Sequence, residues 1–371
     1  MAGKNAAQDL RCPAAVTGAS LKTMTKPYGS SLDDHLDAEV ARDASLADTA
    51  ATIRALAAAA IDVSETVGRG SLAGDLAAQG EHNSDGDVQK ALDVIAHKRF
   101  MQALEEAPVA QVASEEAEDV VELKPDAPLA VAIDPLDGSS NIGVGMVVGT
   151  IFGIRPVTRG EDPNASFLTP GTTQTAAGFV VYGPATTFVV TLGNGTRIFT
   201  LDRTDKVFRL THDAMKIVHT ANEYAINASN VRHWDGPVKS FIEDCLRGSE
   251  GPRDRDFNMR WTAALVADAQ RVLIRGGVFL YPGDNRKGYA QGRLRLLYET
   301  APIAFLIEQA GGAATDGQHR IMERVASKIH ERSPLVFGST EEVECVAKYY
   351  DGRQPSAGRS PLFGQRGLMR S

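Results

Sequence analysis

Apolar residues recur at helical spacing in two stretches of the N-terminal half. Within residues 45–67 they follow the i, i+3, i+4, i+7 and i+8 pattern of an amphipathic helix, and Gly68 and Gly70 come after it. The pattern returns in residues 87–104, behind the polar segment GEHNSDG. The spacing therefore predicts two helices, over residues 45–67 and 87–104.

Short β-like runs dominate the next part of the chain, where apolar and β-branched residues cluster. We predict strands over residues 109–113, 129–133, 146–154, 177–182, 186–192 and 207–210.

The second half alternates between the two kinds of element. We predict a β-like run at 218–224, helices over 237–246 and 262–272, a strand at 278–281, a helix over 298–310 that stops at Gly311 and Gly312, a strand at 335–337 and a helix over 341–350. Strands and helices interleave without a regular βαβ repeat. This order predicts an α/β fold of α+β character, in which mixed sheets are layered with helices.

The composition is that of a folded globular protein. The chain has 371 residues, a length that favours two domains, with 43% apolar and 23% charged residues. The formal net charge of −8 argues against binding to nucleic acid or to an anionic membrane. Residues 1–30 and the basic segment 353–371 lack any periodicity, and we predict that both are mobile tails.

The cysteines and the hydropathy pattern indicate the cellular compartment of the protein. Cys12, Cys245 and Cys345 form no CxxC or Cys/His spacing, so we predict free thiols in a reducing compartment. The N-terminus has no continuous apolar segment, and residues 142–154 are shorter than the roughly 18 apolar residues of a membrane span. These features predict a cytoplasmic protein.

One segment combines the features of a metal site and a phosphate site. The apolar run 130–133 leads into Asp134 and Asp137, which are followed by a Gly-Ser-Ser turn at 138–140. Carboxylates at a strand end are ligands that Mg²⁺ prefers, and turn amides and hydroxyls suit phosphate. Asp-Pro and Asp-Gly are each ordinary turn dipeptides, but their combination behind one strand favours a site. The absence of P-loop, GxSxG and HExxH motifs argues against P-loop enzymes, serine hydrolases and zincins.

Further carboxylates are weaker candidates when each is taken alone. Glu115 and Glu116 follow a β-like run, and adjacent carboxylates repel each other unless they share a cation or a proton. Such a pair is more often a solvated surface pair. Glu299 lies beside an apolar helical run, where burial requires a partner charge or a metal. Asp87 and Asp93 flank a helix start, where carboxylates commonly act as caps.

Six segments together resemble class I fructose-1,6-bisphosphatase. They are DVQKALDVI (87–95), VASEEAED (112–119), DPLDGSSNI (134–142), GGVFLYP (276–282), GRLRLLYETAPIAFLIEQAGGAAT (292–315) and HERSPLVFGSTEEV (330–343). DPLDG is shared with the wider superfamily of lithium-sensitive phosphatases, whereas the SEE and LRLLYE segments favour this member. The resemblance implies the sugar-phosphatase fold, a layered α-β-α-β-α sandwich. It also implies an N-terminal domain over 31–214, which carries most metal ligands, and a C-terminal substrate-binding domain over 215–352.

The resemblance also implies roles for individual residues. The positions that bind metal, two to three Mg²⁺ ions or Mn²⁺, are Glu115, Glu116, Asp134, Asp137, Glu299 and the carbonyl group of Leu136. The positions that take the proton from the attacking water are Asp87, Asp93 and Glu116. The transferred phosphate is held at Gly138, Ser139 and Ser140. The sugar and its distal phosphate are held at Asn227, Leu265, Tyr281 and Arg293, and by Arg260 from a neighbouring subunit, which implies a homotetramer.

The distal-phosphate pocket departs from the family's pattern at three positions. Trp261 and Asn230 stand where the family has Tyr, and Arg293 replaces a Lys. An indole donates one hydrogen bond but does not accept one as a phenol does. We therefore expect this pocket to be altered.

Two regulatory features of relatives are missing from the sequence. Pro128, Leu129 and Pro156 occupy the positions of a Lys, a Tyr and an Arg in the members that AMP inhibits, so we expect weak or absent inhibition by AMP through that site. Residues 157–175 contain no cysteine, so the thiol control of plastid relatives is not expected.

We therefore predict Mg²⁺-dependent hydrolysis of the 1-phosphate of fructose 1,6-bisphosphate, in gluconeogenesis, the Calvin cycle or both. One alternative is sedoheptulose 1,7-bisphosphatase activity, alone or alongside, because the longer sugar presents the same reacting phosphate. An inositol or nucleotide phosphatase has no need of a distal-phosphate pocket. A catalytically silent metal-binding scaffold is an alternative of a different class, but it has no need to keep so many mutually repelling carboxylates.

Overall fold

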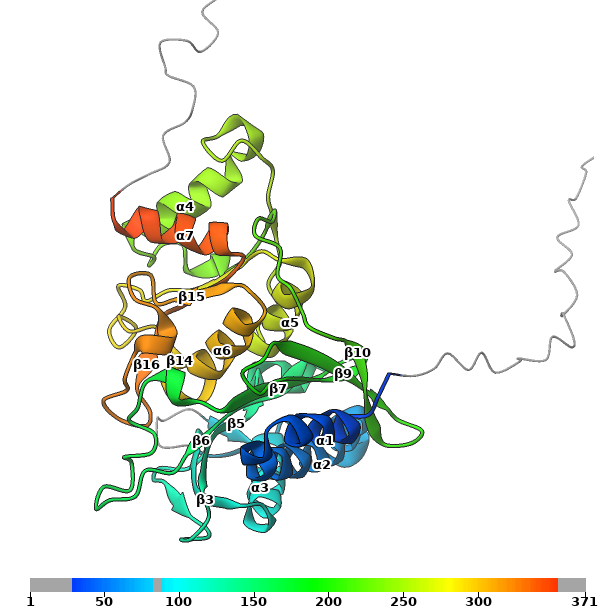
Figure 1. The fold of residues 1–371 in the computed structure, drawn as a ribbon. Coiled ribbons are helices and arrows are strands. Elements are labelled where there is room, and N and C mark those ends of the chain that lie inside the picture. Colours follow the sequence, from blue (N-terminus) through cyan, green and yellow to red (C-terminus); the bar gives the residue numbers. More distant parts are fainter. Residues whose placement is uncertain (1–28, 83–87, 353–371) are drawn as a thin grey trace, which may run out of the picture.

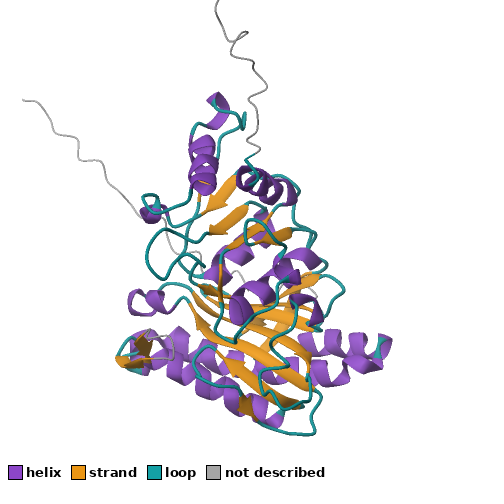
Figure 2. Ribbon diagram, turned by 90° about the vertical axis from the view of Figure 1, so that its left-hand side faces the viewer, coloured by secondary structure: helices purple, strands orange, loops and turns teal. Residues whose placement is uncertain are grey.

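The computed structural model describes residues 29–82 and 88–352. Apart from Gly29 and Ser30, the tails predicted for residues 1–30 and 353–371 lie outside the described residues, and so does Asp87. Figure 1 shows layers of helices alternating with two layers of sheet, and Figure 2 shows the same stacking from the side. The predicted α/β fold with mixed sheets in an α-β-α-β-α sandwich is confirmed.

The larger sheet has eight strands in the order β10-β9-β8-β7-β6-β5-β3-β4. Their bounds are β3 (Val109–Ser114), β4 (Val121–Glu122), β5 (Leu129–Asp137), β6 (Val148–Pro156), β7 (Ala176–Tyr182), β8 (Thr186–Thr191), β9 (Thr196–Asp202) and β10 (Val207–His212). The neighbours β3 and β5 run parallel, whereas the other neighbouring strands of this sheet are antiparallel.

Helices cover both faces of the larger sheet (Figure 1). On one face lie α1 (Leu32–Arg42), α2 (Ala47–Arg69) and α3 (Ala91–Glu106), and on the other lie α5 (Leu265–Arg275) and α6 (Ala301–Gln309). Side chains of β6 alternate between the two cores, with Phe152 and Ile154 packed toward α2 and Ile151 packed toward α5 and α6. Because both faces are buried, the central strands are continuous apolar runs in the sequence.

The helical segment Ala44–Ala73, which contains α2, is long and apolar enough to cross a membrane by length and composition alone. It is not a continuous apolar run in the sequence, because alanines and scattered polar residues make up much of the segment. Its side chains Ile53, Leu56 and Val63 are fully buried in the core beside the larger sheet. Core packing therefore accounts for its apolar character.

The smaller sheet has five strands in the order β12-β11-β13-β17-β15. Their bounds are β11 (Glu223–Ala225), β12 (Asn258–Met259), β13 (Val278–Tyr281), β15 (Ala313–Thr315) and β17 (Leu335–Gly338). The helices α4 (Gly236–Leu246) and α7 (Thr340–Tyr350) cover its outer face, where the rings of Phe241 and Tyr349 meet edge to face. The inner face packs against α5 and α6.

Short elements complete the described chain. Two antiparallel pairs are β1 (Gln79–His82) with β2 (Val88–Lys90) and β14 (Leu294–Arg295) with β16 (Arg332–Ser333). Short stretches of 3-10 helix are η1 (Ala44–Leu46), η2 (Gly70–Ala73), η3 (Ser139–Val144), η4 (Gly171–Thr173), η5 (Ala228–Asn230), η6 (Gly248–Glu250) and η8 (Ile321–Glu323). A turn of π-helix, η7 (Leu296–Thr300), precedes α6.

Several predicted boundaries are wrong. Residues 88–90 form strand β2, and α3 begins at Ala91 because the Asp93 side chain accepts a hydrogen bond from the Lys90 backbone N–H at 2.7 Å. The β-like run predicted at 218–224 is a strand only over Glu223–Ala225, where it pairs with β12 and β13. The predicted helix 298–310 begins as η7 and becomes α-helical at Ala301. The elements α1 and β9 were not predicted.

Candidate active site

The parallel pairing of β3 and β5 brings two acidic segments to one edge of the larger sheet. Glu115 and Glu116 follow β3, and the Glu115 backbone N–H donates to Ile133 O of β5 at 3.0 Å. Asp134 and Asp137 lie in the C-terminal part of β5, and Asp137 is its last residue. Because the carboxyl ends of parallel strands lie at the same edge of a sheet, four carboxylates distant in sequence become neighbours.

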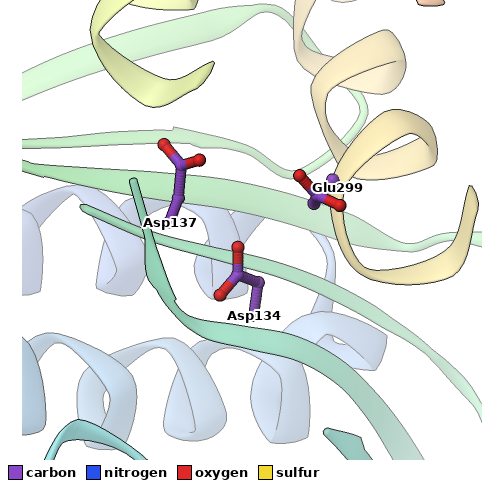
Figure 3. Close-up of side chains that lie close together, drawn as sticks. All are labelled: Asp134, Asp137 and Glu299. Carbon is purple, nitrogen blue, oxygen red and sulfur yellow. The ribbon is translucent and has the colours of Figure 1, made fainter. Parts of the chain in front are cut away.

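Glu299 approaches this edge from η7. Asp134, Asp137 and Glu299 are all buried. Each contributes one carboxylate oxygen to a group of three oxygens that lie within 4.8 Å of one another. Figure 3 shows the three carboxylates facing a common space, two from β5 and one from the helical turn opposite. The π-helical turn thus adds a third buried carboxylate to the pair that β5 supplies.

A cavity of about 350 Å³ opens over these carboxylates. Eleven of the predicted site residues line it: Asp93, Glu115, Glu116, Asp134, Leu136, Asp137, Gly138, Ser139, Ser140, Arg293 and Glu299. Gln89 and Lys90 of β2 complete the wall. The structure therefore gathers the predicted metal, base and phosphate positions in one place, apart from Asp87.

The carboxylates of the cavity are held in place by backbone N–H groups. The N–H of Leu136 donates to Asp134 Oδ1 at 2.9 Å, that of Val266 to Asp137 Oδ2 at 2.9 Å, and that of Arg295 to Glu299 Oε2 at 2.6 Å. Asp93 accepts from the N–H of Lys90. Each side chain therefore has a fixed orientation at the cavity wall.

Burial and mutual repulsion make these carboxylates weak acids. Burial, reinforced by the charges of neighbouring carboxylates, raises the pKa of Asp134 and Glu299 well above the usual range. Burial also raises the pKa of Asp137 to about 6, although the backbone N–H groups of Val266, Leu265 and Gly138 lower it. Buried carboxylates that repel one another are suited to binding hard divalent cations, whose positive charge would offset the repulsion.

Asp93 lies at the rim of the cluster, at the start of α3. Burial raises its pKa to about 6, with the neighbouring Lys90 acting in the opposite direction. Its Oδ1 is buried without a hydrogen-bond partner among the described residues. Asp93 therefore supplies a carboxylate oxygen that no side chain of the described protein engages.

The turn after β5 depends on a glycine. Gly138 has φ of +80°, a conformation that favours glycine, and a Cβ atom at this position would lie 2.8 Å from Ala264 Cβ. The amide groups of η3 follow directly, and Lys90 Nζ donates to Ser139 O at 2.6 Å. The turn is thus fixed between α5 and β2 at the mouth of the cavity.

A narrow second pocket adjoins the cavity, and Arg293 lines both. Asn227, Asn230 and Tyr281 also line this pocket. Three of the predicted substrate residues, Asn227, Tyr281 and Arg293, therefore lie together. Leu265 lies elsewhere, buried at the start of α5 beside Asp137.

Two further substrate-pocket positions lie apart from the lining residues. Arg260 follows β12 with its side chain exposed, and its guanidinium donates to Met259 O at 2.7 Å. The Trp261 ring stacks on Phe279, with ring centroids 5.7 Å apart.

Three residues at the site were not among the predicted site residues. Gln89 Nε2 donates to Glu116 Oε2 at 2.5 Å, and Lys90 contacts the turn at Ser139. Arg295 is 4% exposed and pairs with Glu115 at 3.4 Å. The only signal in the sequence was their position beside Asp93 and Glu299, since isolated basic or amide residues are usually on the surface.

Asp268, in the first turn of α5, is another buried carboxylate close to this site. It is 1% exposed, and its Oδ2 accepts from the Thr262 backbone N–H at 3.4 Å. Its Oδ1 has no hydrogen-bond partner within the described part of the chain. Burial raises its pKa to about 7, against the lowering effect of Thr262.

Asp268 is expected to make stability depend on pH. Because its folded-state pKa lies above the unfolded value of about 4, the stability it contributes is fully present below pH 4 and is lost as the pH rises through about 7. We expect Asp268→Asn to be more stable than the parent by about 1–3 kcal/mol at pH 8 and equally stable near pH 4. Urea unfolding of the metal-free proteins at both pH values measures this, and a gain that is the same at both would contradict the assignment.

The layered fold and the carboxylate-lined cavity define the chain as a sugar phosphatase. Two family models match it in succession, "Fructose-1-6-bisphosphatase, N-terminal domain" over residues 36–213 and "Fructose-1-6-bisphosphatase, C-terminal domain" over residues 217–351. The chain belongs to the class I fructose-1,6-bisphosphatase family.

Individual relatives agree with this assignment. The class 1 fructose-1,6-bisphosphatase of a strain of Methylorubrum extorquens is 96% identical over 348 residues, which is 94% of this chain and 100% of the relative. That of Methylobacterium radiotolerans is 67% identical and covers 92% of this chain and 98% of the relative. The crystal structure of Leishmania major fructose-1,6-bisphosphatase in holo form matches with a TM-score of 0.82 at 32% identity, covering 88% of this chain and 100% of that one. The family predicted from the six sequence segments is confirmed.

Proposed function

We infer that the protein hydrolyses the 1-phosphate of fructose 1,6-bisphosphate, giving fructose 6-phosphate and inorganic phosphate. The observation that carries this inference is membership of the family over both domains, with relatives named for this activity along nearly the whole chain. The geometry supports this function, because the carboxylate-lined cavity lies next to a second pocket and Arg293 lines both. Such a pair of sites suits a sugar with a phosphate at each end.

For the metal we propose two to three Mg²⁺ or Mn²⁺ ions. The ligands would be Glu115, Glu116, Asp134, Asp137, Glu299 and the carbonyl group of Leu136. The donor set is entirely oxygen, and the raised pKa values of its buried members are the expected cost of clustering anions without a cation. When bound, such ions stabilise the charge that develops on the leaving oxygen of the sugar.

The remaining cavity residues divide between proton transfer and phosphate binding. We propose that Asp93 and Glu116, together with Asp87, accept the proton of the attacking water. A pKa near 6 suits Asp93 as a general base. A carboxylate of this basicity is ionised at neutral pH and is still basic enough to accept a proton from water. The amides and hydroxyls of residues 138–140 would hold the transferred phosphate, because the turn presents them at the cavity wall.

For the sugar and its distal phosphate we propose Asn227, Leu265, Tyr281 and Arg293. We further propose that the exposed Arg260 reaches into the pocket of a neighbouring subunit of a homotetramer. The compartment that suits this enzyme and its free thiols Cys245 and Cys345 is the cytoplasm.

Weak or absent inhibition by AMP remains a prediction from the sequence. Leu129 and Pro156 are cross-strand partners at the shared end of β5 and β6, and Pro128 precedes them. Neither proline nor leucine offers a side-chain donor for a phosphate at this place. Titration of phosphate release with AMP checks it, and half-maximal inhibition at micromolar AMP would contradict it.

The assay of the proposed function is phosphate release from three substrates with and without Mg²⁺. They are fructose 1,6-bisphosphate, sedoheptulose 1,7-bisphosphate and inositol 1-phosphate. We expect metal-dependent release from the first, and the preference between the two bisphosphates assigns the pathway, gluconeogenesis or the Calvin cycle. Preference for inositol 1-phosphate would overturn the proposal, and release from none of the three would leave the silent scaffold as the function.

A further inference from the structure

In the pocket beside the cavity, the guanidinium groups of two arginines lie close to the same aromatic ring. The guanidinium carbon of Arg286 lies 4.4 Å from the centroid of the Tyr289 ring, and that of Arg293 lies 5.2 Å from the same centroid. Arg286 and Tyr289 line this pocket together with Asn227 and Tyr281. The loop between β13 and β14 therefore brings a second arginine to a pocket whose other polar side chains are Asn227, Asn230, Tyr281, Tyr289 and the Asp284 carboxylate.

Arg286 is held in a fixed orientation. Its Nε donates to Asp284 Oδ1 and Oδ2 at 3.0 Å each, its Nη2 donates to Asp284 Oδ2, and its backbone N–H donates to Asp284 Oδ1 at 2.9 Å. Its Nη1 has no hydrogen-bond partner within the described residues. A guanidinium held along one edge and stacked on a ring presents its remaining N–H groups as a preorganised donor set.

The Tyr281 hydroxyl lies in the field of both arginines. Burial raises the pKa of Tyr281, and the positive charges of Arg293 and Arg286 act in the opposite direction. The phenol, the amide of Asn227 and the two guanidinium groups thus surround the same small space. Hydrogen-bond donors with positive charge around a narrow space fit a phosphate ester.

We propose that Arg286 is a further binding residue for the phosphate at the far end of the sugar bisphosphate, acting beside Arg293. Tyr289 is the platform that holds the two guanidinium groups on one ring, and Asp284 fixes the angle of Arg286. This inference rests on the proposed function. It adds a specificity determinant, because a substrate without a distal phosphate gains nothing from Arg286.

Arg286→Gln tests the assignment, with Lys287→Gln as the matched control. Lys287 is the next residue, is exposed and lines neither pocket, so its substitution removes the same charge from the same loop. For Arg286→Gln we expect the KM for fructose 1,6-bisphosphate to rise about tenfold with kcat little changed, as for the loss of a charge-assisted hydrogen bond. Arg286→Lys, which keeps the charge but not the fork, should lie between the two.

Fructose 1-phosphate is the discriminating substrate, because it has the reacting phosphate but no distal one. We expect its kinetics to be the same in wild type, Arg286→Gln and Lys287→Gln. A KM for fructose 1,6-bisphosphate within twofold of wild type would overturn the inference. An equal loss on both substrates would also overturn it, since it would show that Arg286 merely holds the loop.

Fructose 6-phosphate gives a readout that does not need turnover. It carries the distal phosphate alone, and calorimetry on the whole protein measures its binding. We expect Arg286→Gln to weaken this binding about tenfold and Lys287→Gln to leave it unchanged. If the wild type hydrolysed no bisphosphate, the proposed function would fail, whereas this measurement would still decide the role of Arg286. Equal affinities in wild type and Arg286→Gln would refute it.

Discussion

Asp137→Asn is expected to lower kcat/KM for fructose 1,6-bisphosphate by about a thousandfold. The substitution replaces one buried anion of the Asp134, Asp137 and Glu299 cluster by a neutral amide of nearly the same shape. The amide oxygen still accepts from the Val266 N–H, so the local fold is retained. The expected loss therefore reports the missing charge at the metal site, and steady-state phosphate release at saturating Mg²⁺ measures it.

Thermal unfolding separates this effect from a folding defect. Because burial raises the pKa of Asp137 to about 6, the stability it contributes is lost as the pH rises through that value. Metal-free Asp137→Asn should then be at least as stable as the parent at pH 8. The rise in Tm that Mg²⁺ gives the parent should be much smaller in the variant. Asp126→Asn, at an exposed position before β5, is the control, and an equal activity loss there or an unchanged Mg²⁺ effect in Asp137→Asn would refute the metal role.

The site was predictable where one strand carries its chemistry. β5 is buried along its whole length, so it is a continuous apolar run, and Asp134 and Asp137 stand out at its end. The contribution of Glu115 and Glu116 follows from the parallel pairing of β3 with β5, which no local pattern reveals. Only the family resemblance placed these two residues at the site.

Other contacts depend on tertiary structure that the sequence pattern does not encode. Lys90 and Ser139, which are 49 residues apart, meet only because β2 packs at the mouth of the cavity. Glu299 belongs to a π-helical turn, whereas apolar spacing predicted an ordinary helix there. The wider turn cannot be read from periodicity over five residues.

The missed elements have local causes. The buried face of α1 carries Leu32 and Leu36 but also His35 and Glu39, so its apolar stripe is too short to predict a helix. In β9, the strand starts with the polar residues Thr196 and Arg197, and Thr200 separates Ile198 and Phe199 from Leu201. Tertiary contacts join the two elements: Arg197 of β9 pairs with Glu39 of α1 at 4.0 Å, and Asn194, just before β9, donates to Glu39 at 2.7 Å.

Glu342→Gln is expected to destabilise the fold by about 3–5 kcal/mol. Glu342, in the first turn of α7, is completely buried and forms ion pairs with Arg253 and Arg255. Arg253 is itself only 6% exposed, and its guanidinium lies 5.1 Å from the Phe241 ring centroid and 4.8 Å from that of Phe257. Loss of the carboxylate therefore leaves a buried charge without its counterion, and urea unfolding at pH 7 measures the cost.

Two companion variants distinguish the lost ion pair from a general effect of altering α7. Glu344→Gln changes an exposed residue of the same helix and should shift the free energy of unfolding by less than about 0.5 kcal/mol. Adding Arg253→Met to Glu342→Gln removes the unpaired charge and places an apolar side chain between the two rings, so most of the loss should be recovered. A double variant no more stable than Glu342→Gln alone would mean that packing around Glu342, and not the stranded charge of Arg253, accounts for the destabilisation.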